Sequence, residues 1–174
     1  MNILHNLWNI VSTEDENLMK YMLVVLGIVE AYVTMKFFTT FLSIEYTKKQ
    51  RNIYLIIMEL VMILSTFFAP KQFALFVHLI LTFLIIKFVF KISFVKSLLA
   101  EIVPMLLTVL LETVYVKLCL NLFGISITDC ANIIIYRIPY MLFNYLTIYL
   151  IAKYVKFIKI NLTSFDNINK NQRK

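Results

Sequence analysis

The chain has 174 residues, of which 61% are hydrophobic and 16% are charged, and its formal net charge is +7. Because soluble domains are only about half apolar, this composition excludes an ordinary water-soluble enzyme or binding domain and indicates an integral membrane protein. The basic residues flank apolar runs, so we interpret them as topology signals and expect no nucleic-acid partner.

The segment before Thr13 predicts a short amphipathic helix that lies at the membrane surface. Its apolar side chains, such as Leu4 and Trp8, share one helical face, and polar side chains such as Asn6 share the other. Residues 13–16 then read T-x-x-E, a capping box that predicts the start of the first membrane helix. No basic region with a cleavage site precedes it, so we expect the mature chain to keep its first residues.

Five apolar segments follow, and each comes close to or exceeds the length that crosses the roughly 30 Å hydrocarbon core of a bilayer. We therefore predict an all-α membrane protein, a bundle of about five transmembrane helices in one domain over residues 1–160, with a short polar tail at 161–174. The predicted spans are residues 18–42, 53–69, 73–90, 97–120 and 133–152.

Basic residues distinguish the two ends of the predicted bundle. Five spans place alternate connections on alternate sides, and most of the 17 basic residues fall on the side of the C-terminal tail. These are Lys48, Lys49, Arg51, Lys87, Lys91, Lys96, Lys153, Lys156, Lys159, Lys170, Arg173 and Lys174. The positive-inside rule then predicts a multi-pass protein of the cell membrane with its N-terminus outside and its C-terminus in the cytoplasm.

Ionisable side chains inside the spans are the candidate functional residues. Arg137 interrupts the last span, and a charge near the bilayer centre costs roughly 3 kcal/mol on insertion scales, so such residues usually face a bundle interior or a wet cavity. Glu112 lies about one helical turn deeper than Arg137, and we predict that the two pair across the fourth and fifth spans. We expect the pair to share one cavity with three further side chains, those of His78, Glu59 and Glu30.

Two other features of these spans bear on the cavity. Pro104 and Pro139 predict bends in the fourth and fifth spans, because proline cannot donate a backbone hydrogen bond inside a helix. The tyrosines near Arg137 are more typical of an interfacial belt than of a ligand groove. They are Tyr136, Tyr140, Tyr145 and Tyr149.

The polar residues also have a purely structural interpretation. Polar side chains between membrane helices hold neighbouring helices together by about 0.6 to 2 kcal/mol each. A ligand cavity and a packing device therefore stay open as alternatives for this network.

Metal and catalytic chemistry have little support in the sequence. Cys119 and Cys130 lack metal-ligand spacing, and no histidine belongs to an H-E-x-x-H motif, so we expect no metal site and no cofactor. A peptide-processing membrane protease would need Cys119 and His78 to meet, and nothing in the sequence orients them as a nucleophile pair. A substrate-capture subunit of a vitamin transporter is the other alternative, although such subunits use six spans and a coupling face of small residues.

Two stretches, FKISFVKSLLAEIVP (residues 90–104) and IIIYRIPYMLFNYLTIYLI (residues 133–151), resemble the multi-pass sensor region of GHKL-type sensor histidine kinases. This class includes the accessory-gene-regulator receptor kinases for peptide pheromones of low-GC bacteria. The resemblance extends through EAYVTMKFFTTFL (residues 30–42) and NLTSFDN (residues 161–167).

The resemblance implies a quorum-sensing receptor of a two-component system. Its expected ligand is an extracellular peptide or small molecule, and its expected partners are the lipid bilayer, a second copy of the chain or a cytoplasmic kinase. The 174 residues contain no phosphoacceptor-histidine helix and no glycine-rich nucleotide-binding box, so we expect no kinase activity from this chain itself.

Overall fold

The computed structural model describes residues 16–68, 70–126, 129 and 133–172, and these residues form helices joined by short connections. The helices are α2 (Glu16–Phe41), α3 (Lys48–Phe67), α4 (Lys71–Phe90), α5 (Phe94–Phe123) and α7 (Ile134–Gln172). No strand occurs in the described residues, which confirms the all-α prediction. The predicted surface helix and the T-x-x-E cap lie outside the described residues.

Four of these helices are long and apolar enough to cross a membrane. The qualifying segments are Asn17–Phe41, Lys48–Phe67, Phe94–Leu122 and Ile134–Phe157. The apolar part of α4, Leu75–Phe90, is shorter and measures about 24 Å at the usual rise per residue. The structure is thus compatible with membrane insertion, and the number of crossings stays a prediction.

Capping side chains start α3 and α5 before the spans that were predicted for them. α3 begins at Lys48 because Thr47 and Gln50 form a capping box, in which the Thr47 hydroxyl accepts from the Gln50 backbone N–H at 3.2 Å. Ser93 caps α5 in a similar way, and Gly124 ends that helix in a left-handed conformation with φ of 66°. α7 runs through the predicted tail to Gln172 as one helix. The apolar segments in the sequence thus account for part of α3, α5 and α7, and each of these helices extends beyond its segment at one end or both.

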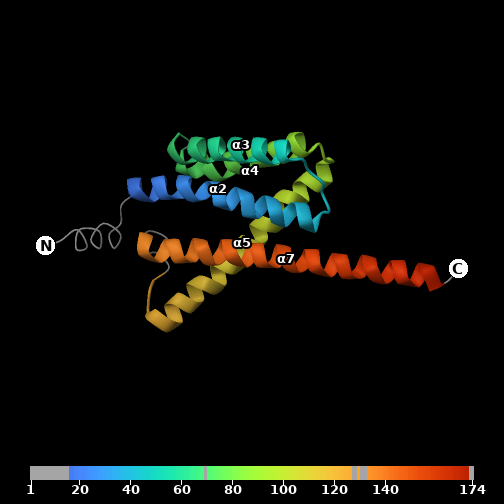
Figure 1. The fold of residues 1–174 in the computed structure, drawn as a ribbon. Coiled ribbons are helices and arrows are strands. Elements are labelled where there is room, and N and C mark those ends of the chain that lie inside the picture. Colours follow the sequence, from blue (N-terminus) through green and yellow to red (C-terminus); the bar gives the residue numbers. More distant parts are fainter. Residues whose placement is uncertain (1–15, 69, 127–128, 130–132, 173–174) are drawn as a thin grey trace.

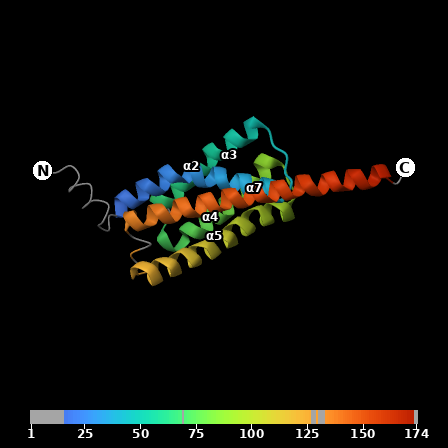
Figure 2. The same ribbon diagram turned by 60° about the horizontal axis from the view of Figure 1, so that its bottom comes forward.

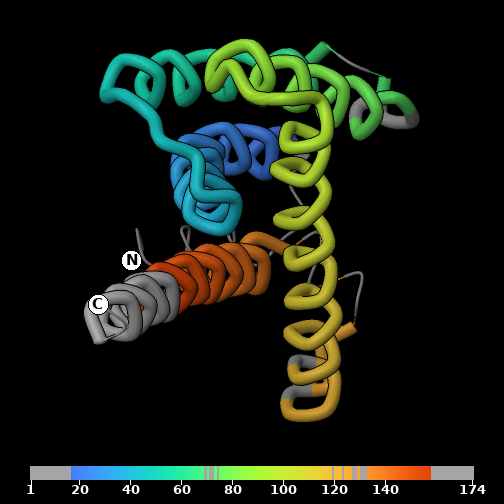
Figure 3. Tube along the Cα trace, turned by 90° about the vertical axis from the view of Figure 1, so that its right-hand side faces the viewer, coloured from blue at the N-terminus to red at the C-terminus, as the bar shows by residue number. Residues whose placement is uncertain are grey.

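α2 lies at the centre of the bundle (Figures 1 and 2). α3 and α4 lie side by side above it, α7 lies below it, and α5 runs obliquely across the others (Figure 3). α5 therefore contacts α4, α2 and α7 in turn. The α2–α3 and α4–α5 connections lie at the same end of the bundle as the C-terminal half of α7 (Figure 1).

One face of α2 packs against α3 and α4 through a cluster of buried apolar residues. Phe38 is the aromatic centre of this contact, with its ring centroid 5.5 Å from that of Phe90 and 6.0 Å from that of Tyr54. Edge-to-face rings at such distances are favourable beyond the area that they bury. The buried members of the cluster are Ala31, Met35, Phe38, Tyr54, Met58, Ile86, Phe90 and Ala100.

The opposite face of α2 packs against α7. Val33 and Phe37 of α2 are buried here, and side chains of α5 cover the same cluster from the side. The buried residues of α7 are Tyr140, Met141, Tyr145, Ile148 and Ala152. Residues 33 and 37 are one turn apart, as are 31, 35 and 38, so the two faces follow directly from helical periodicity.

The outer surface of the bundle is strongly apolar. α5 alone exposes Leu106, Val109 and Leu110 along one face, and similar side chains are exposed on every helix. A water-soluble monomer rarely exposes apolar patches of this extent, whereas lipid tails solvate them well.

We predict that Phe90→Ala destabilises the bundle and that Phe88→Ala, on the same helix, does not. Phe90 is 5% exposed and contacts three aromatic rings, whereas Phe88 is 69% exposed. Phe90→Ala should lower the free energy of unfolding by no more than the roughly 3–5 kcal/mol seen for Phe→Ala in the cores of water-soluble proteins, because detergent tails solvate the unfolded chain. Thermal unfolding of both variants in the same detergent measures it, and equal melting temperatures would contradict the packing of α4.

Candidate functional site

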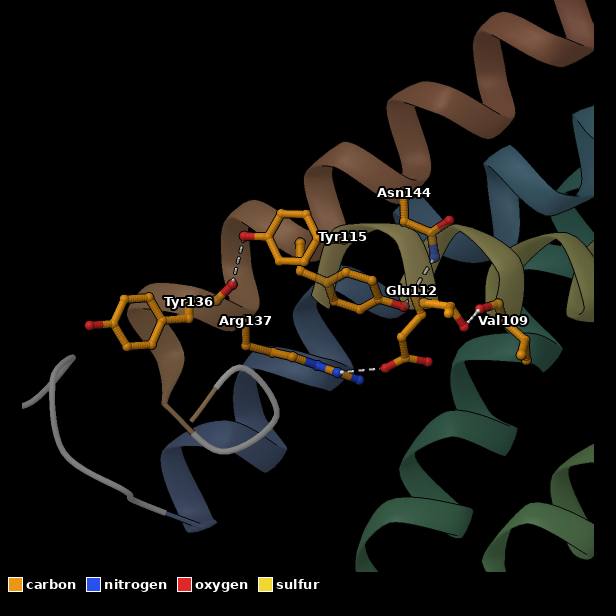
Figure 4. Close-up of polar contacts among 8 residues, drawn as sticks. Val109, Glu112, Tyr115, Tyr136, Arg137 and Asn144 are labelled. Carbon is orange, nitrogen blue, oxygen red and sulfur yellow. Dashed lines mark hydrogen bonds and ion pairs between the residues drawn. The ribbon is translucent and has the colours of Figure 1, made fainter. Parts of the chain in front are cut away.

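Arg137 and Glu112 form the ion pair that the sequence predicts. Arg137 Nη1 lies 3.4 Å from Glu112 Oε1 and joins the first turn of α7 to α5 (Figure 4). The side chains are 25% and 42% exposed, so the pair sits at the edge of the bundle and not in its interior. A long, partly exposed contact of this kind contributes little stability by itself.

Aromatic and amide side chains continue from Arg137 into the bundle. Its guanidinium lies 4.8 Å from the centroid of the Tyr140 ring, and Asn144 Nδ2 donates to the Tyr140 hydroxyl at 3.5 Å. The Tyr115 hydroxyl donates to the Tyr136 carbonyl at 3.3 Å and links α5 to α7 a second time (Figure 4). Cation–π contact with a buried ring fixes the arginine over the α2–α7 cluster.

Glu30 of α2 forms a hydrogen bond with α7. The Tyr145 hydroxyl donates to Glu30 Oε2 at 2.9 Å, within the normal range for a hydrogen bond, and links α7 to α2. Tyr140 and Tyr145 are both buried, which makes the belt interpretation wrong for these two tyrosines. Their positions 140 and 145 lie on the α7 face that meets α2, and a belt tyrosine would face lipid.

A cavity of about 310 Å³ lies between α2, α3, α4 and α5. Its polar lining includes Glu30, His78, Glu101 and Tyr54. Thr82 also lines it, and its Oγ1 is buried without a hydrogen-bond partner among the described residues. The lining is rich in hydrogen-bond acceptors, so it suits a ligand that carries donors or positive charge.

The predicted network therefore divides into two parts. Glu30 and His78 line the cavity as expected, whereas Arg137 and Glu112 do not and lie at the α5–α7 contact. Glu59 is not in the lining either, because its carboxylate lies against Gly27 of α2, where Oε2 is buried without a partner among the described residues. The expectation of one shared cavity was wrong, because Glu112 contacts Arg137 of α7 and does not line the cavity between α2, α3, α4 and α5. The oblique course of α5 across the bundle is visible in Figure 3.

Sequence reasoning did not assign Glu101 to the site. Glu101, Pro104 and Thr108 all line the cavity, and their i, i+3 and i+7 spacing puts them on one face of α5. That spacing is visible in the sequence and could have identified Glu101. Pro104 and Pro139 both lie inside continuous helices, and the bends predicted for them stay predictions.

Metal and nucleophile chemistry gain no support from the described residues. Among them, no group of three or more His, Cys, Asp or Glu side chains could hold a metal ion. The side chain of Cys119 lies outside the described part, so the structure does not test its pairing with His78.

Comparisons with known proteins found no relative: no protein-family model matches the chain, and no curated protein or solved structure does so. The resemblance to sensor regions of histidine kinases therefore rests on the quoted stretches alone.

We predict that Glu30 and Tyr145 are energetically coupled. In a double-mutant cycle of Glu30→Gln and Tyr145→Phe, the coupling should be about 0.6–1.7 kcal/mol, the range for interhelical hydrogen bonds in a membrane protein. Chemical unfolding in mixed micelles measures it. The control cycle pairs Glu30→Gln with Tyr154→Phe, an exposed tyrosine of α7. Equal coupling in both cycles would contradict the hydrogen bond.

Proposed function

We propose that the chain is a membrane-embedded sensor module that binds an extracellular peptide or small ligand and transmits a change in helix packing to a cytoplasmic partner. One observation carries the proposal: a single helix, α7, holds Arg137, Tyr140 and Tyr145 near its start and continues without interruption to Gln172. A helix responds to force as a fairly rigid rod, so a shift at its outer end moves its inner end.

The proposed orientation has the N-terminus outside and the C-terminus in the cytoplasm of a cell membrane. The support is the charge distribution, since the helix ends rich in lysine gather at one end of the bundle with the C-terminal half of α7. In this orientation the Arg137–Glu112 pair lies toward the outer surface, where an extracellular ligand arrives.

The proposed ligand interacts with both parts of the polar network. Arg137 offers donors at the edge of the bundle, and Glu30 and Glu101 offer carboxylate oxygens in the cavity. A peptide supplies acceptors in its carbonyl groups and donors in its amino group and N–H groups. Glu30 contacts Tyr145 and lines the cavity, so it links ligand contacts to the α2–α7 interface.

The proposed partner is a cytoplasmic kinase or a second copy of this chain. The part of α7 beyond the bundle, which runs to Gln172, is the element through which such a partner would be contacted. This interpretation agrees with the resemblance to the sensor region of histidine kinases, and we assign no catalytic activity to the chain itself.

We predict that the α3–α4 turn faces outward and the α4–α5 turn faces the cytoplasm. In a background where Cys119 and Cys130 are replaced by serine, Phe68→Cys should react with a membrane-impermeable maleimide in intact cells. Lys91→Cys should react only after the membrane is permeabilised. Both positions are exposed and lie in turns, so reactivity reports the side of the membrane. The reverse pattern would overturn the orientation.

We predict that site variants weaken ligand binding selectively. A panel of short peptides with free amino termini is screened by thermal shift against the purified chain in lipid nanodiscs. For peptides that stabilise the parent, Arg137→Ala and Glu101→Gln should each weaken binding about tenfold, because each removes a charge-assisted hydrogen bond.

Lys117→Ala is the matched control, since Lys117 is an exposed charge on α5 outside both parts of the network. Its affinity should equal that of the parent. If every stabilising peptide bound the parent and both site variants equally, recognition would lie elsewhere and the proposed sensing site would be wrong.

A further inference from the structure

A second and larger pocket lies between α2 and α7, near the end of the bundle that carries the α2–α3 connection. It has a volume of about 650 Å³. Its lining combines three lysines with three tyrosines: Lys36, Lys153, Lys156, Tyr32, Tyr46 and Tyr149. None of these residues belongs to the cavity or to the Arg137–Glu112 pair, so this pocket is a separate feature of the fold.

Tyrosines position two of the three lysines, Lys36 and Lys153. Lys36 Nζ donates to the Tyr46 hydroxyl at 2.7 Å and lies 5.7 Å from the centroid of the Tyr32 ring. Lys153 Nζ lies 5.5 Å from the centroid of the Tyr149 ring. Such contacts position an ammonium group without neutralising its charge.

The pocket carries an excess of positive charge. Glu45 is the one carboxylate among its described lining residues, against the three lysines. None of the three lysines forms an ion pair with a described carboxylate. At a membrane boundary, such a basic pocket between transmembrane helices is suited to a phosphate group.

Two exposed apolar stripes lead from the pocket toward the middle of the bundle. On α2, Val25, Val29 and Tyr32 repeat at helical spacing below Lys36 and are exposed. On α7, the matching exposed residues are Leu142, Leu146 and Tyr149. From Val25 to Lys36 the helix rises about 16 Å, close to the roughly 15 Å thickness of one leaflet of hydrocarbon.

We propose that this pocket binds the phosphate headgroup of an anionic phospholipid, whose acyl chains lie along the two stripes. The lysines contact the phosphodiester, the tyrosines lie at the level of the headgroup, and α2 and α7 share the lipid between them. A soluble phosphate ester has the same charge but would leave the stripes unused. The proposal requires only that α2 and α7 lie in a bilayer, and it goes beyond the ligand-sensing role.

Native mass spectrometry of the full chain in detergent tests this site by titration with phosphatidylglycerol, phosphatidylcholine or glycerophosphoglycerol, the same headgroup without acyl chains. The parent should prefer phosphatidylglycerol to both other probes by roughly tenfold or more. Lys153→Gln/Lys156→Gln should lose that preference by a similar factor, because each lysine near an anionic headgroup contributes substantially. Lys153→Arg/Lys156→Arg should keep it.

The matched control is Lys49→Gln/Lys96→Gln, which removes the same charge from exposed positions in the first turns of α3 and α5, outside the pocket. Its affinity for phosphatidylglycerol should change by less than about threefold. An equal loss in both glutamine pairs would show diffuse surface attraction and overturn the site. So would equal binding of the two lipids, or binding of glycerophosphoglycerol as tight as that of the lipid. If the glutamine pair fails to fold by circular dichroism, the arginine pair and the parent's lipid preference decide.

Discussion

The packing of α2 on both of its faces is the contact on which the rest of the bundle depends. Phe38 and Met35 face α3 and α4, while Phe37 and Val33 face α7, and each set belongs to a different buried cluster. Lipid tails are as apolar as these side chains, so helix association in a membrane depends on close packing and polar contacts and not on exclusion of water. At Gly27, an added Cβ would lie 3.2 Å from Met62 Cγ and 3.3 Å from Glu59 Oε2, so a small residue there lets α3 approach closely.

Glu30 lies where the two packing faces of α2 meet. It accepts from Tyr145 on the α7 side and lines the cavity on the α3, α4 and α5 side. Hydrogen bonds between membrane helices are typically weak, about 0.6 kcal/mol on average, which is comparable to thermal energy. Glu30 can therefore give up its hydrogen bond with Tyr145 and bind a ligand instead at a small cost in free energy. Such an exchange suits a residue that changes partners when a ligand binds. The packing interpretation and the sensing interpretation of Glu30 are therefore not exclusive.

The sequence predicted the parts of the structure that depend on local patterns. Apolar runs identified the helices, and the depth of each residue from the end of its span paired Arg137 with Glu112. Depth along a helix follows from the rise per residue, so the sequence contains it. The predicted spans did not contain the first turns of α3 and α5, which Thr47 and Ser93 cap, because capping is independent of hydrophobicity. The prediction of a single shared cavity was wrong because comparing residues by depth alone treats the helices as roughly parallel. The crossing of α5 is set by which side chains interlock, and single-sequence periodicity does not contain that information.

α7 contributes residues to the ion pair, to the Glu30 hydrogen bond and to the lysine pocket. Arg137 is in its first turn, Tyr145 contacts Glu30 a few turns later, and Lys153 lines the lysine pocket at the middle of the helix. Two ligands that each favour one position of the same rigid element are coupled, and the coupling is reciprocal by thermodynamic linkage. If the headgroup and the extracellular ligand both favour the same packing of α7 on α2, each raises the affinity of the other. In the proposed orientation, the anionic lipid content of the inner leaflet would then set the threshold at which an outer ligand moves the C-terminal part of α7.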